Sequence, residues 1–304
     1  MRLQDLGTDG LRARMRDGGV TLRLSPFTVR VRSDIPHLAA DVAAMYPDFE
    51  VVGDDAFVDF HVAVLRSSHW LSRLQGRAEF WFDGQRSFTP LPAAQALSML
   101  EWGINWCIAA HAHQYLLIHA AVLERGGRAL LMPAPPGSGK STLCAALAHR
   151  GWRLLSDELG LLDMATGLVH GMARPINLKN ASIGLIRSFV PEAVFSAEMP
   201  NTSKGTVALV RAPQDAIDAR HAPARPAWVV LPSWRADAPA RMQPIERARA
   251  FMDLAEQSFN YDVHGQAGFQ ALGRLVGACG CHHFEYSRLD EALPEFEALL
   301  EAAP

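Results

Sequence analysis

The feature that most constrains the fold of this 304-residue chain is a glycine-rich loop between a strand pattern and a helix pattern. Residues 134–141 read Ala-Pro-Pro-Gly-Ser-Gly-Lys-Ser, and they match the phosphate-binding pattern G-x-x-x-x-G-K-[ST] except at the first glycine. The apolar run before the loop predicts a strand, and residues 140–150 predict a helix that Gly151 ends. A strand, the loop and a helix in this order are the context that the motif requires.

Each residue type in this loop has an expected role in binding a nucleotide. The two glycines let backbone N–H groups converge on phosphate oxygens, and the start of the following helix adds partial positive charge. The lysine reaches the outer phosphates, and the serine after it supplies a ligand for magnesium. The expected nucleotide-binding residues are Pro136, Gly137, Ser138, Gly139, Lys140, Ser141 and Thr142.

An acidic pair, Asp157 and Glu158, follows the lysine of the loop by only 17 and 18 residues. Magnesium needs oxygen ligands, and transfer of a phosphoryl group to a hydroxyl needs a base within hydrogen-bond reach. Asp157 is the candidate base, and Glu158 is the candidate carboxylate on the metal side. The alternative is a solvated acidic turn, because acidic residues commonly lie outside the core.

A histidine, His119, lies 21 residues before Lys140 on a predicted strand that pairs with the strand feeding the loop. Gly126 and Gly127 form the predicted turn between these two strands. The pairing would let the histidine side chain reach the terminal phosphate. A single histidine on a mostly apolar strand is, however, more often structural.

Residues 117–163, LIHAAVLERGGRALLMPAPPGSGKSTLCAALAHRGWRLLSDELGLLD, resemble the core of the HPr kinase/phosphorylase family, and in particular the group of HPr-related kinase A. The resemblance implies a P-loop kinase core related to phosphoenolpyruvate carboxykinase. It also implies ATP and Mg²⁺ as cofactors and a serine hydroxyl as the acceptor. By matched position it places His119 near the transferred phosphate. It makes Asp157 the catalytic acid/base, Glu158 the second acid and Ser141 the metal ligand.

Two departures from the family pattern limit the resemblance. Ala120 stands where the family has a glycine after the histidine. Residues 172–180 read Met-Ala-Arg-Pro-Ile-Asn-Leu-Lys-Asn, so the glutamate of the family's Glu-x-Arg-Gly-x-Gly signature has no counterpart. This argues against phosphorylase activity. Residues 254–261 resemble the C-terminal helix of the same family.

Two further lysines, Lys179 and Lys204, stand beside turn-forming residues after predicted core strands, where active-site loops tend to lie. Either is a candidate catalytic cation that would clamp the transferring phosphate. An ordinary exposed lysine is an equally good interpretation of each. Arg174 is a weaker candidate for the same role.

The hydrophobic pattern predicts two modules within an α/β fold. Alternating residues at 19–32, 55–66 and 77–91 predict an antiparallel β-rich module over residues 1–91, with a hairpin turn at Asp83 and Gly84. Residues 92–304 are expected to form the P-loop, HPr-kinase-like catalytic domain. In that domain the pattern predicts a helix after Pro92, one strand over 152–163, a surface connection over 211–226 and an amphipathic helix over 246–261.

Composition excludes several classes of protein. The net charge of −3 and the lack of a long basic run argue against nucleic acid as a partner. No window approaches ~18 apolar residues, and the N-terminus has no apolar signal region, so no membrane association is expected. Four cysteines are too few for a disulfide framework, which favours a cytoplasmic location. Residues 279–283, Cys-Gly-Cys-His-His, indicate a buried strand rather than a zinc site.

The favoured hypothesis is an ATP-dependent serine kinase that acts on a small protein or peptide. The resemblance adds a small peptide-chaperone protein and a homo-oligomer as possible partners. A small molecule with a hydroxyl is an alternative acceptor, and a switch that binds ATP without transfer is an alternative function. Decarboxylation of the carboxykinase kind is disfavoured, because no arginine pattern for an oxaloacetate site is present.

Overall fold

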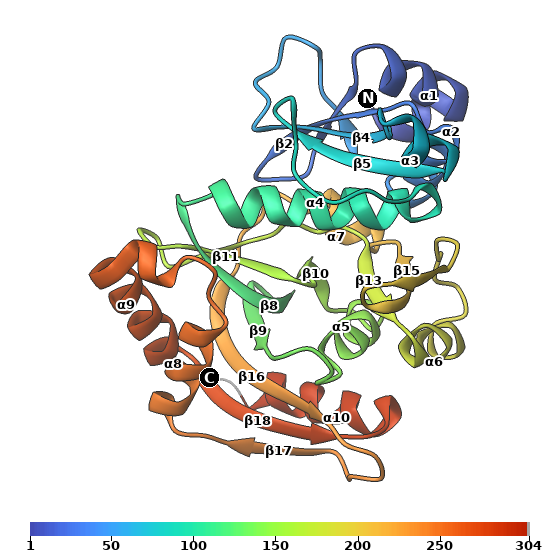
Figure 1. Ribbon diagram of the computed structural model, residues 1–304. Helices are drawn as coiled ribbons and strands as arrows, with labels where there is room; N and C mark the ends of the chain where they lie inside the picture. The colour runs from blue at the N-terminus through green and yellow to red at the C-terminus, as the bar shows by residue number, and fades with distance from the viewer. Residues whose placement is uncertain (303–304) are drawn as a thin grey trace. The chain divides into compact units, whose positions relative to one another are not determined.

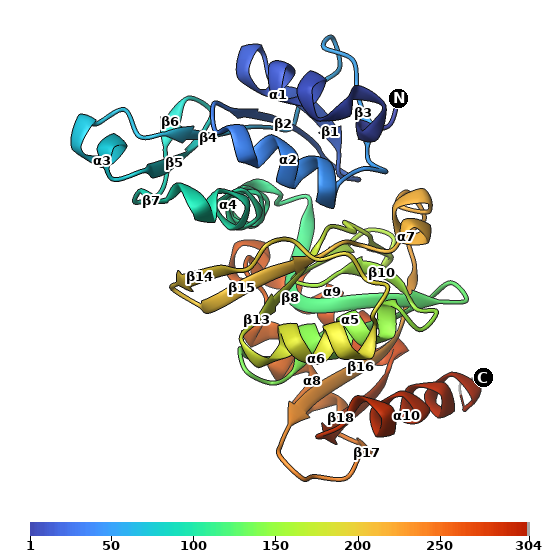
Figure 2. The same cartoon turned by 90° about the vertical axis from the view of Figure 1, so that its right-hand side faces the viewer.

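The computed structural model describes residues 1–302 and shows a mixed α/β architecture with three separate sheets (Figures 1 and 2). The α/β class expected from the sequence is therefore confirmed. Contacts within the chain define two compact units. The first unit comprises Met1–His111, Ala173–Arg187 and Pro191–Arg220, and the second comprises Ala112–Met172, Ser188–Val190 and His221–Pro304. This division does not coincide with the predicted boundary between residues 91 and 92.

The first unit begins with a seven-stranded sheet of order β3-β1-β2-β4-β5-β6, in which β7 pairs with β5. At Asp83 and Gly84 both φ angles are positive, as the predicted hairpin turn between β5 and β6 requires. The elements are η1(Leu3–Leu6), α1(Gly7–Asp17), β1(Val20–Arg23), β2(Thr28–Ser33), α2(Pro36–Met45), β3(Glu50–Val51), β4(Phe60–Arg66), α3(Trp70–Leu74), β5(Arg77–Phe82), β6(Gln85–Arg86) and β7(Leu91–Pro92).

The expectation of a purely antiparallel module is wrong at one pair of strands, because β2 and β4 run parallel. The chain between them includes α2 and β3 and is long enough for a crossover connection, which a parallel pair requires.

The remainder of the first unit surrounds a three-stranded sheet of order β13-β15-β14 (Figure 2). The predicted surface connection over 211–226 contains a short helix, α7, which the sequence pattern did not predict. The elements are η2(Ala93–Gln95), α4(Ala96–His111), β13(Ile176–Lys179), α6(Ala181–Phe189), of which the last residues belong to the second unit, β14(Met199–Thr202), β15(Gly205–Val210) and α7(Gln214–Asp218).

The second unit is built on an eight-stranded sheet of order β12-β11-β8-β9-β16-β18-β17, with β10 paired to β8 (Figure 1). Gly126 and Gly127 both have positive φ and form the predicted turn between β8 and β9. The elements are β8(Tyr115–Arg125), β9(Arg128–Pro133), α5(Lys140–Ala148), β10(Arg153–Ser156), β11(Leu159–Asp163), β12(Val169–His170), β16(Arg225–Trp234), β17(Arg241–Pro244), α8(Arg247–Glu256), α9(Tyr261–Ala278), β18(Gly280–Tyr286) and α10(Leu289–Glu301).

Helices cover both faces of this sheet. Alternate residues of β8 and β9, among them Ile118 and Leu131, form one core cluster with apolar residues of α8 and α9. Aromatic rings on the other face join the sheet to α10: Phe284 of β18 lies 5.0 Å from Phe296, and Trp152 lies 6.3 Å from Phe296. The strands are therefore fixed between two apolar layers, as is usual for a sheet with parallel strands.

The directions of the strands bring several loops to one edge of the sheet. β9, β16 and β18 run parallel to one another. β10 and β9 are both antiparallel to β8, so β10 points the same way as β9. The segments that follow β9, β16 and β18 consequently leave the same edge, whereas β10 continues after Asp157 and Glu158 into β11, which also pairs with β8. In open α/β sheets, the carboxyl edge of the strands is where ligands bind.

The predicted helix over 246–261 is two helices separated by a short segment of turns. α8 ends at Glu256, and α9 begins at Tyr261. Between them, Phe259 N donates to Leu117 O (2.9 Å), and the Asn260 side chain accepts from Leu117 N and donates to Tyr115 O (both 2.9 Å). These bonds to β8 replace helical bonds, so the helix does not continue through this segment.

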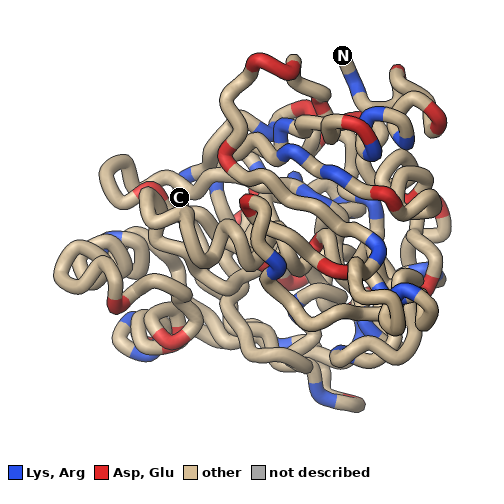
Figure 3. The backbone as a smooth tube through the Cα atoms, turned by 45° about the horizontal axis from the view of Figure 1, so that its top comes forward, with Lys and Arg blue, Asp and Glu red and all other residues tan. Residues whose placement is uncertain are grey.

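Basic and acidic positions are interspersed over residues 1–302, without a long run of one sign (Figure 3). None of the helices within this part of the chain has the length and apolar character needed to cross a lipid bilayer.

Candidate functional site

The glycine loop leaves the sheet after β9 and leads directly into α5. Gly137 and Gly139 have φ angles of 89° and 84°, a region that residues with a Cβ rarely adopt. Ala134 has no such angle, so alanine fits where the usual motif has its first glycine. A Cβ added to Gly137 would meet no atom within 4 Å, so this side of the loop is open. Gly139 is the N-cap of α5, whose first-turn N–H groups have no partner within the helix.

Two aromatic residues hold the loop from the side of β16 and β18. Trp234 N donates to Ser138 O (2.9 Å), and the Tyr286 hydroxyl donates to Gly139 O (2.9 Å). A Cβ on Gly139 would lie 2.3 Å from the Tyr286 oxygen and 2.9 Å from the Trp234 Cβ. Burial raises the pKa of Tyr286, so its hydroxyl remains a proton donor at neutral pH. Glycine is thus required at position 139 both by its backbone angle and by close packing.

Lys140, Ser141 and Thr142 occupy the first turn of α5, as predicted. Lys140 is buried and only 8% exposed, whereas Ser141 and Thr142 are partly exposed. Ser138 carries a buried hydroxyl that finds no hydrogen-bond partner among residues 1–302. A buried polar atom of this kind is a group that a ligand can satisfy.

Asp157 and Glu158 interrupt the single strand that the sequence predicts over 152–163, because β10 ends at Ser156 and β11 begins at Leu159. The Ser156 hydroxyl accepts from Leu159 N (2.9 Å) and from Glu158 N (3.3 Å), which fixes the turn. Asp157 is only 8% exposed, and Glu158 is partly buried. The interpretation of Asp157 as a solvated acidic turn residue therefore does not hold.

The register of the strands brings this acidic turn close to the glycine loop. Both β10 and β11 pair with β8, with Ser156 opposite Val122 and Leu159 opposite His119. On the other side of β8, Ala120 is opposite Pro133, the last residue before the loop. Neighbouring strands lie about 4.8 Å apart, so the backbone of the acidic turn is roughly 10 Å from the start of the loop.

The pKa of the Cys144 thiol, on α5, responds to charges both from the acidic turn and from the end of the glycine loop. Burial is the main cause that raises the pKa of this thiol well above its usual value, and the negative charge of Asp157 raises it further. The positive charge of Lys140 acts in the opposite direction. Both charged side chains are therefore near Cys144.

His119 lies on β8 between the loop and the acidic turn, on the face opposite to that of Ile118 and Ala120. Its backbone N donates to Gln257 O (2.7 Å), and its Nδ1 lies 3.2 Å from Gln257 Oε1. The ring of Phe259 is 5.7 Å from the imidazole. The segment between α8 and α9 thus holds this histidine in place.

Lys179 and Lys204 lie in the first unit, on its three-stranded sheet. Lys179 ends β13, and its N–H donates to Ser182 Oγ (2.9 Å). Lys204 lies between β14 and β15, and its Nζ is 5.1 Å from the centre of the Trp102 ring. Their catalytic roles remain predictions.

Arg174 is 4% exposed and forms an ion pair with Glu101 (2.9 Å). Glu101 also pairs with Tyr46, so Arg174 belongs to a buried polar network of the first unit. Such a network gives the arginine a structural function.

For magnesium, Ser141 and Glu158 remain the predicted protein ligands. Within residues 1–302, no three or more His, Cys, Asp or Glu side chains gather in a way that could hold a metal ion. A magnesium ion bound through nucleotide phosphates does not need such a group, because it takes only one or two carboxylates from the protein. Cys279 and Cys281 are both buried: Cys279 is the C-cap residue of α9, and Cys281 lies in β18, a strand with both buried and partly exposed residues.

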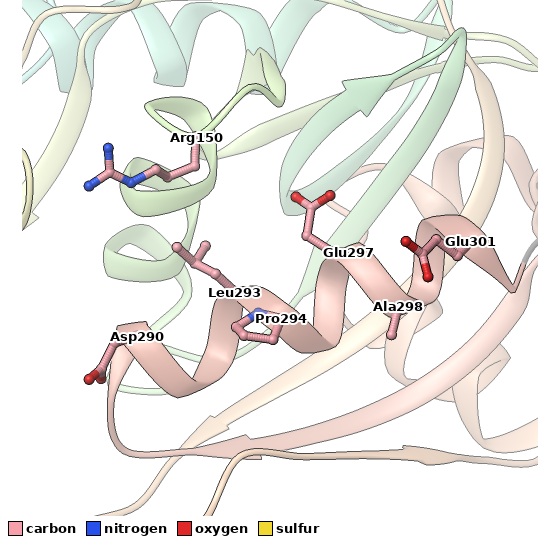
Figure 4. Close-up of a pocket in the computed structure, with 7 residues that line it drawn as sticks. All are labelled: Arg150, Asp290, Leu293, Pro294, Glu297, Ala298 and Glu301. Atoms are coloured by element: carbon pink, nitrogen blue, oxygen red, sulfur yellow. The ribbon is translucent and has the colours of Figure 1, made fainter.

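A surface pocket of about 630 Å³ lies away from this edge, between α10 and the segment that follows α5 (Figure 4). Arg150, Glu297 and Glu301 are among its lining residues. Because α5 has nine residues, about 13 Å of helix separates its two ends. This pocket is therefore not part of the candidate site.

Four residues of the site were not predicted from the sequence: Ser156, Trp234, Gln257 and Tyr286. A serine just before the acidic pair was the only one with a local signal. The other three lie far along the chain from the groups that they contact, and no motif marks them.

Comparison of the chain with models of known protein families found no match. No curated protein sequence matched it either.

Proposed function

We propose that this protein is an ATP-dependent kinase with a P-loop core of the HPr kinase type, which transfers a phosphoryl group to a serine of a small protein or peptide. The observation that carries the proposal is the order of groups on neighbouring strands of the sheet. A glycine loop follows β9, His119 lies on the neighbouring strand β8, and Asp157 follows β10. Parts for gripping phosphate and a buried carboxylate thus occupy successive strands.

Several features of the glycine loop support a site for a triphosphate. Gly137 and Gly139 have positive φ angles, the open side of Gly137 allows a close approach, and Lys140 begins the helix. In glycine-rich phosphate loops, backbone N–H groups and the start of a helix bind the anion. The buried Ser138 hydroxyl would gain a partner in a phosphate oxygen. Ser141 and Glu158 would hold Mg²⁺. When bound, MgATP supplies the phosphoryl group.

Asp157 would accept the proton of the attacking hydroxyl as a general base. Its low exposure keeps water away from this carboxylate, which favours transfer over hydrolysis. His119, positioned by Gln257, would lie beside the transferring phosphate. In phosphoryl transfer, positioning and charge stabilisation provide nearly all of the catalysis, and Lys179 and Lys204 remain candidates for the cationic clamp.

The acceptor is the least constrained part of the proposal. A serine on a small protein or peptide, with a peptide-chaperone protein as a further partner, follows from the resemblance alone. The same chemistry would serve a small molecule with a hydroxyl. Association of several copies of the chain is likewise an expectation from the resemblance.

The test is incubation of the full chain with γ-labelled ATP, Mg²⁺ and the products of neighbouring genes, followed by mass spectrometry of whatever gains phosphate. Asp157→Asn is expected to lower the rate of transfer by ~10²-fold or more with little change in ATP affinity. Asp253→Asn is the matched control, because Asp253 forms an exposed helical ion pair with Arg249 (2.8 Å).

Unchanged transfer in Asp157→Asn would reject the assignment of the base. ATP binding that depends on Lys140, without phosphate transfer to any acceptor, would instead support the alternative of a nucleotide-binding switch.

A further inference from the structure

We infer that a surface hollow beside the glycine loop receives the purine base of the nucleotide. The inference rests on the proposed function, which places only the phosphates. The hollow has a volume of about 590 Å³ and lies between the loop that follows β16 and the turn that joins β18 to α10. Its lining includes Trp234, Ala236, Asp237, Ser287, Arg288 and Glu291.

A single residue, Trp234, connects the hollow to the glycine loop. Trp234 lines it and also contacts the loop directly, because its backbone N donates to Ser138 O (2.9 Å). Its Cβ would be 2.9 Å from a Cβ on Gly139. A nucleotide whose phosphates lie on this loop therefore has the hollow within reach of its nucleoside end.

The order of the strands determines which end of the nucleotide lies there. Asp157 follows β10, which is separated from β9 by β8, whereas Trp234 ends β16 on the opposite side of β9. If the terminal phosphate faces Asp157, the rest of the molecule leaves the loop toward β16. Three strand spacings separate β10 from β16, roughly 14 Å, which is on the scale of an extended nucleoside triphosphate.

The chemistry of the lining suits a flat aromatic ring with exocyclic amino groups. The Trp234 side chain is large and 49% exposed, and its indole N–H donates to Ser287 O (3.0 Å), which fixes the ring plane. A fixed indole is a stacking surface for a base. The carboxylates of Asp237 and Glu291 can accept hydrogen bonds from amino groups of a purine. Arg288 lies 3.3 Å from Glu291 and moderates its charge.

The test compares the binding of MgATP with that of magnesium tripolyphosphate, which has no base, by calorimetry on the full chain. Trp234→Ala keeps the backbone N–H and the Cβ that contact the loop but removes the ring. It is expected to weaken ATP binding by about 10-fold or more and to weaken tripolyphosphate binding much less. Trp234→Phe keeps an aromatic face and should retain most of the ATP affinity.

Ala236→Trp is a second, independent variant. Ala236 is exposed, so a larger side chain there fills the hollow without disturbing the core. It should also weaken ATP binding selectively. Equal loss of both ligands in Trp234→Ala, or full ATP affinity in both Trp234→Ala and Ala236→Trp, would overturn the inference.

These outcomes separate the inference from the proposed function. ATP and tripolyphosphate binding that Lys140→Ala abolishes, with no effect of the hollow variants, would overturn the inference alone. Failure of the unaltered chain to bind either ligand would contradict both.

Discussion

At the scale of single residues, Gly139 is the position where both the backbone angle and the packing require glycine. Its φ of 84° disfavours any side chain, and the space that a Cβ would need is taken by Tyr286 and Trp234. Gly137 has a similar angle but an open side. The two glycines of the motif therefore differ: one is fixed by its neighbours, and the other faces the space that we assign to phosphate.

Replacing each glycine by alanine should separate these two roles. Gly137→Ala should lower the free energy of unfolding by about 1–2 kcal/mol, the cost of the left-handed angle. Gly139→Ala should cost roughly 2–4 kcal/mol, because overpacking against Tyr286 and Trp234 is added to that strain. Urea unfolding of both variants measures the difference. Equal losses of stability would show that packing against Tyr286 and Trp234 does not restrict position 139.

The residues that a local motif can identify were predictable, and those that depend on distant pairing were not. Gly137, Gly139 and Lys140 stand at fixed spacing between a strand and a helix, so the sequence places them. Tyr286 reaches Gly139 across 147 positions, and Gln257 reaches His119 across 138. These contacts arise from how β18 joins the sheet and how the segment after α8 pairs with β8. No local pattern encodes either arrangement.

At the scale of secondary-structure elements, the interruption between β10 and β11 is the feature that lets the acidic pair take the roles that we propose for it. A continuous strand over 152–163 would have pointed Asp157 and Glu158 to opposite faces. The hydroxyl of Ser156 offers the backbone an alternative to the strand ladder, and the register of β10 on β8 shifts between Leu154 and Ser156. The hydrophobic pattern predicts one strand over 152–163, but the hydrogen bonds of the Ser156 hydroxyl determine where that strand is interrupted.

The turn after β11 gives a prediction on acid stability. Asp163 Oδ1 accepts from Thr166 N (3.1 Å) and Ala165 N (2.8 Å), and the bond from Thr166 is the main cause that lowers the pKa of Asp163. A carboxyl whose pKa is lower in the folded state stabilises the fold above its unfolded pKa of about 3.9. This contribution is lost as the pH falls through the lowered folded value.

Asp163→Asn should therefore be less stable than the unaltered chain at pH 7, and the difference should shrink as the pH falls below about 4. Urea midpoints at several pH values provide the measurement. A difference in stability that stays constant from pH 7 to pH 3 would show that the charge of Asp163 does not contribute to this turn.

At the scale of the whole molecule, the class of fold followed from the sequence, but the grouping of its segments did not. The strand, loop and helix order indicates an α/β protein, and the structure agrees. The first compact unit, however, combines residues 1–111 with most of 173–220. The buried pair of Arg174 and Glu101 joins these separate segments (2.9 Å). Hydrophobic periodicity predicts that a strand forms, and it does not say which sheet the strand joins.

The composition of the whole chain offers an unusually clear test of the phosphate-binding claim. The protein has 26 arginines but only three lysines: Lys140, Lys179 and Lys204. All three are candidate residues of the proposed kinase. A reagent that modifies amines can therefore be followed to each lysine separately.

The most direct measurement is labelling of the full chain with an acyl-phosphate derivative of ATP, which transfers its acyl group to an amine beside the bound phosphates, followed by peptide mass spectrometry. We expect Lys140 to be labelled and excess MgATP to prevent that labelling, because the proposed function places this amino group, at the start of α5, beside the triphosphate. Lys140 that stays unlabelled, or that is labelled equally with and without excess MgATP, would contradict the proposed nucleotide site.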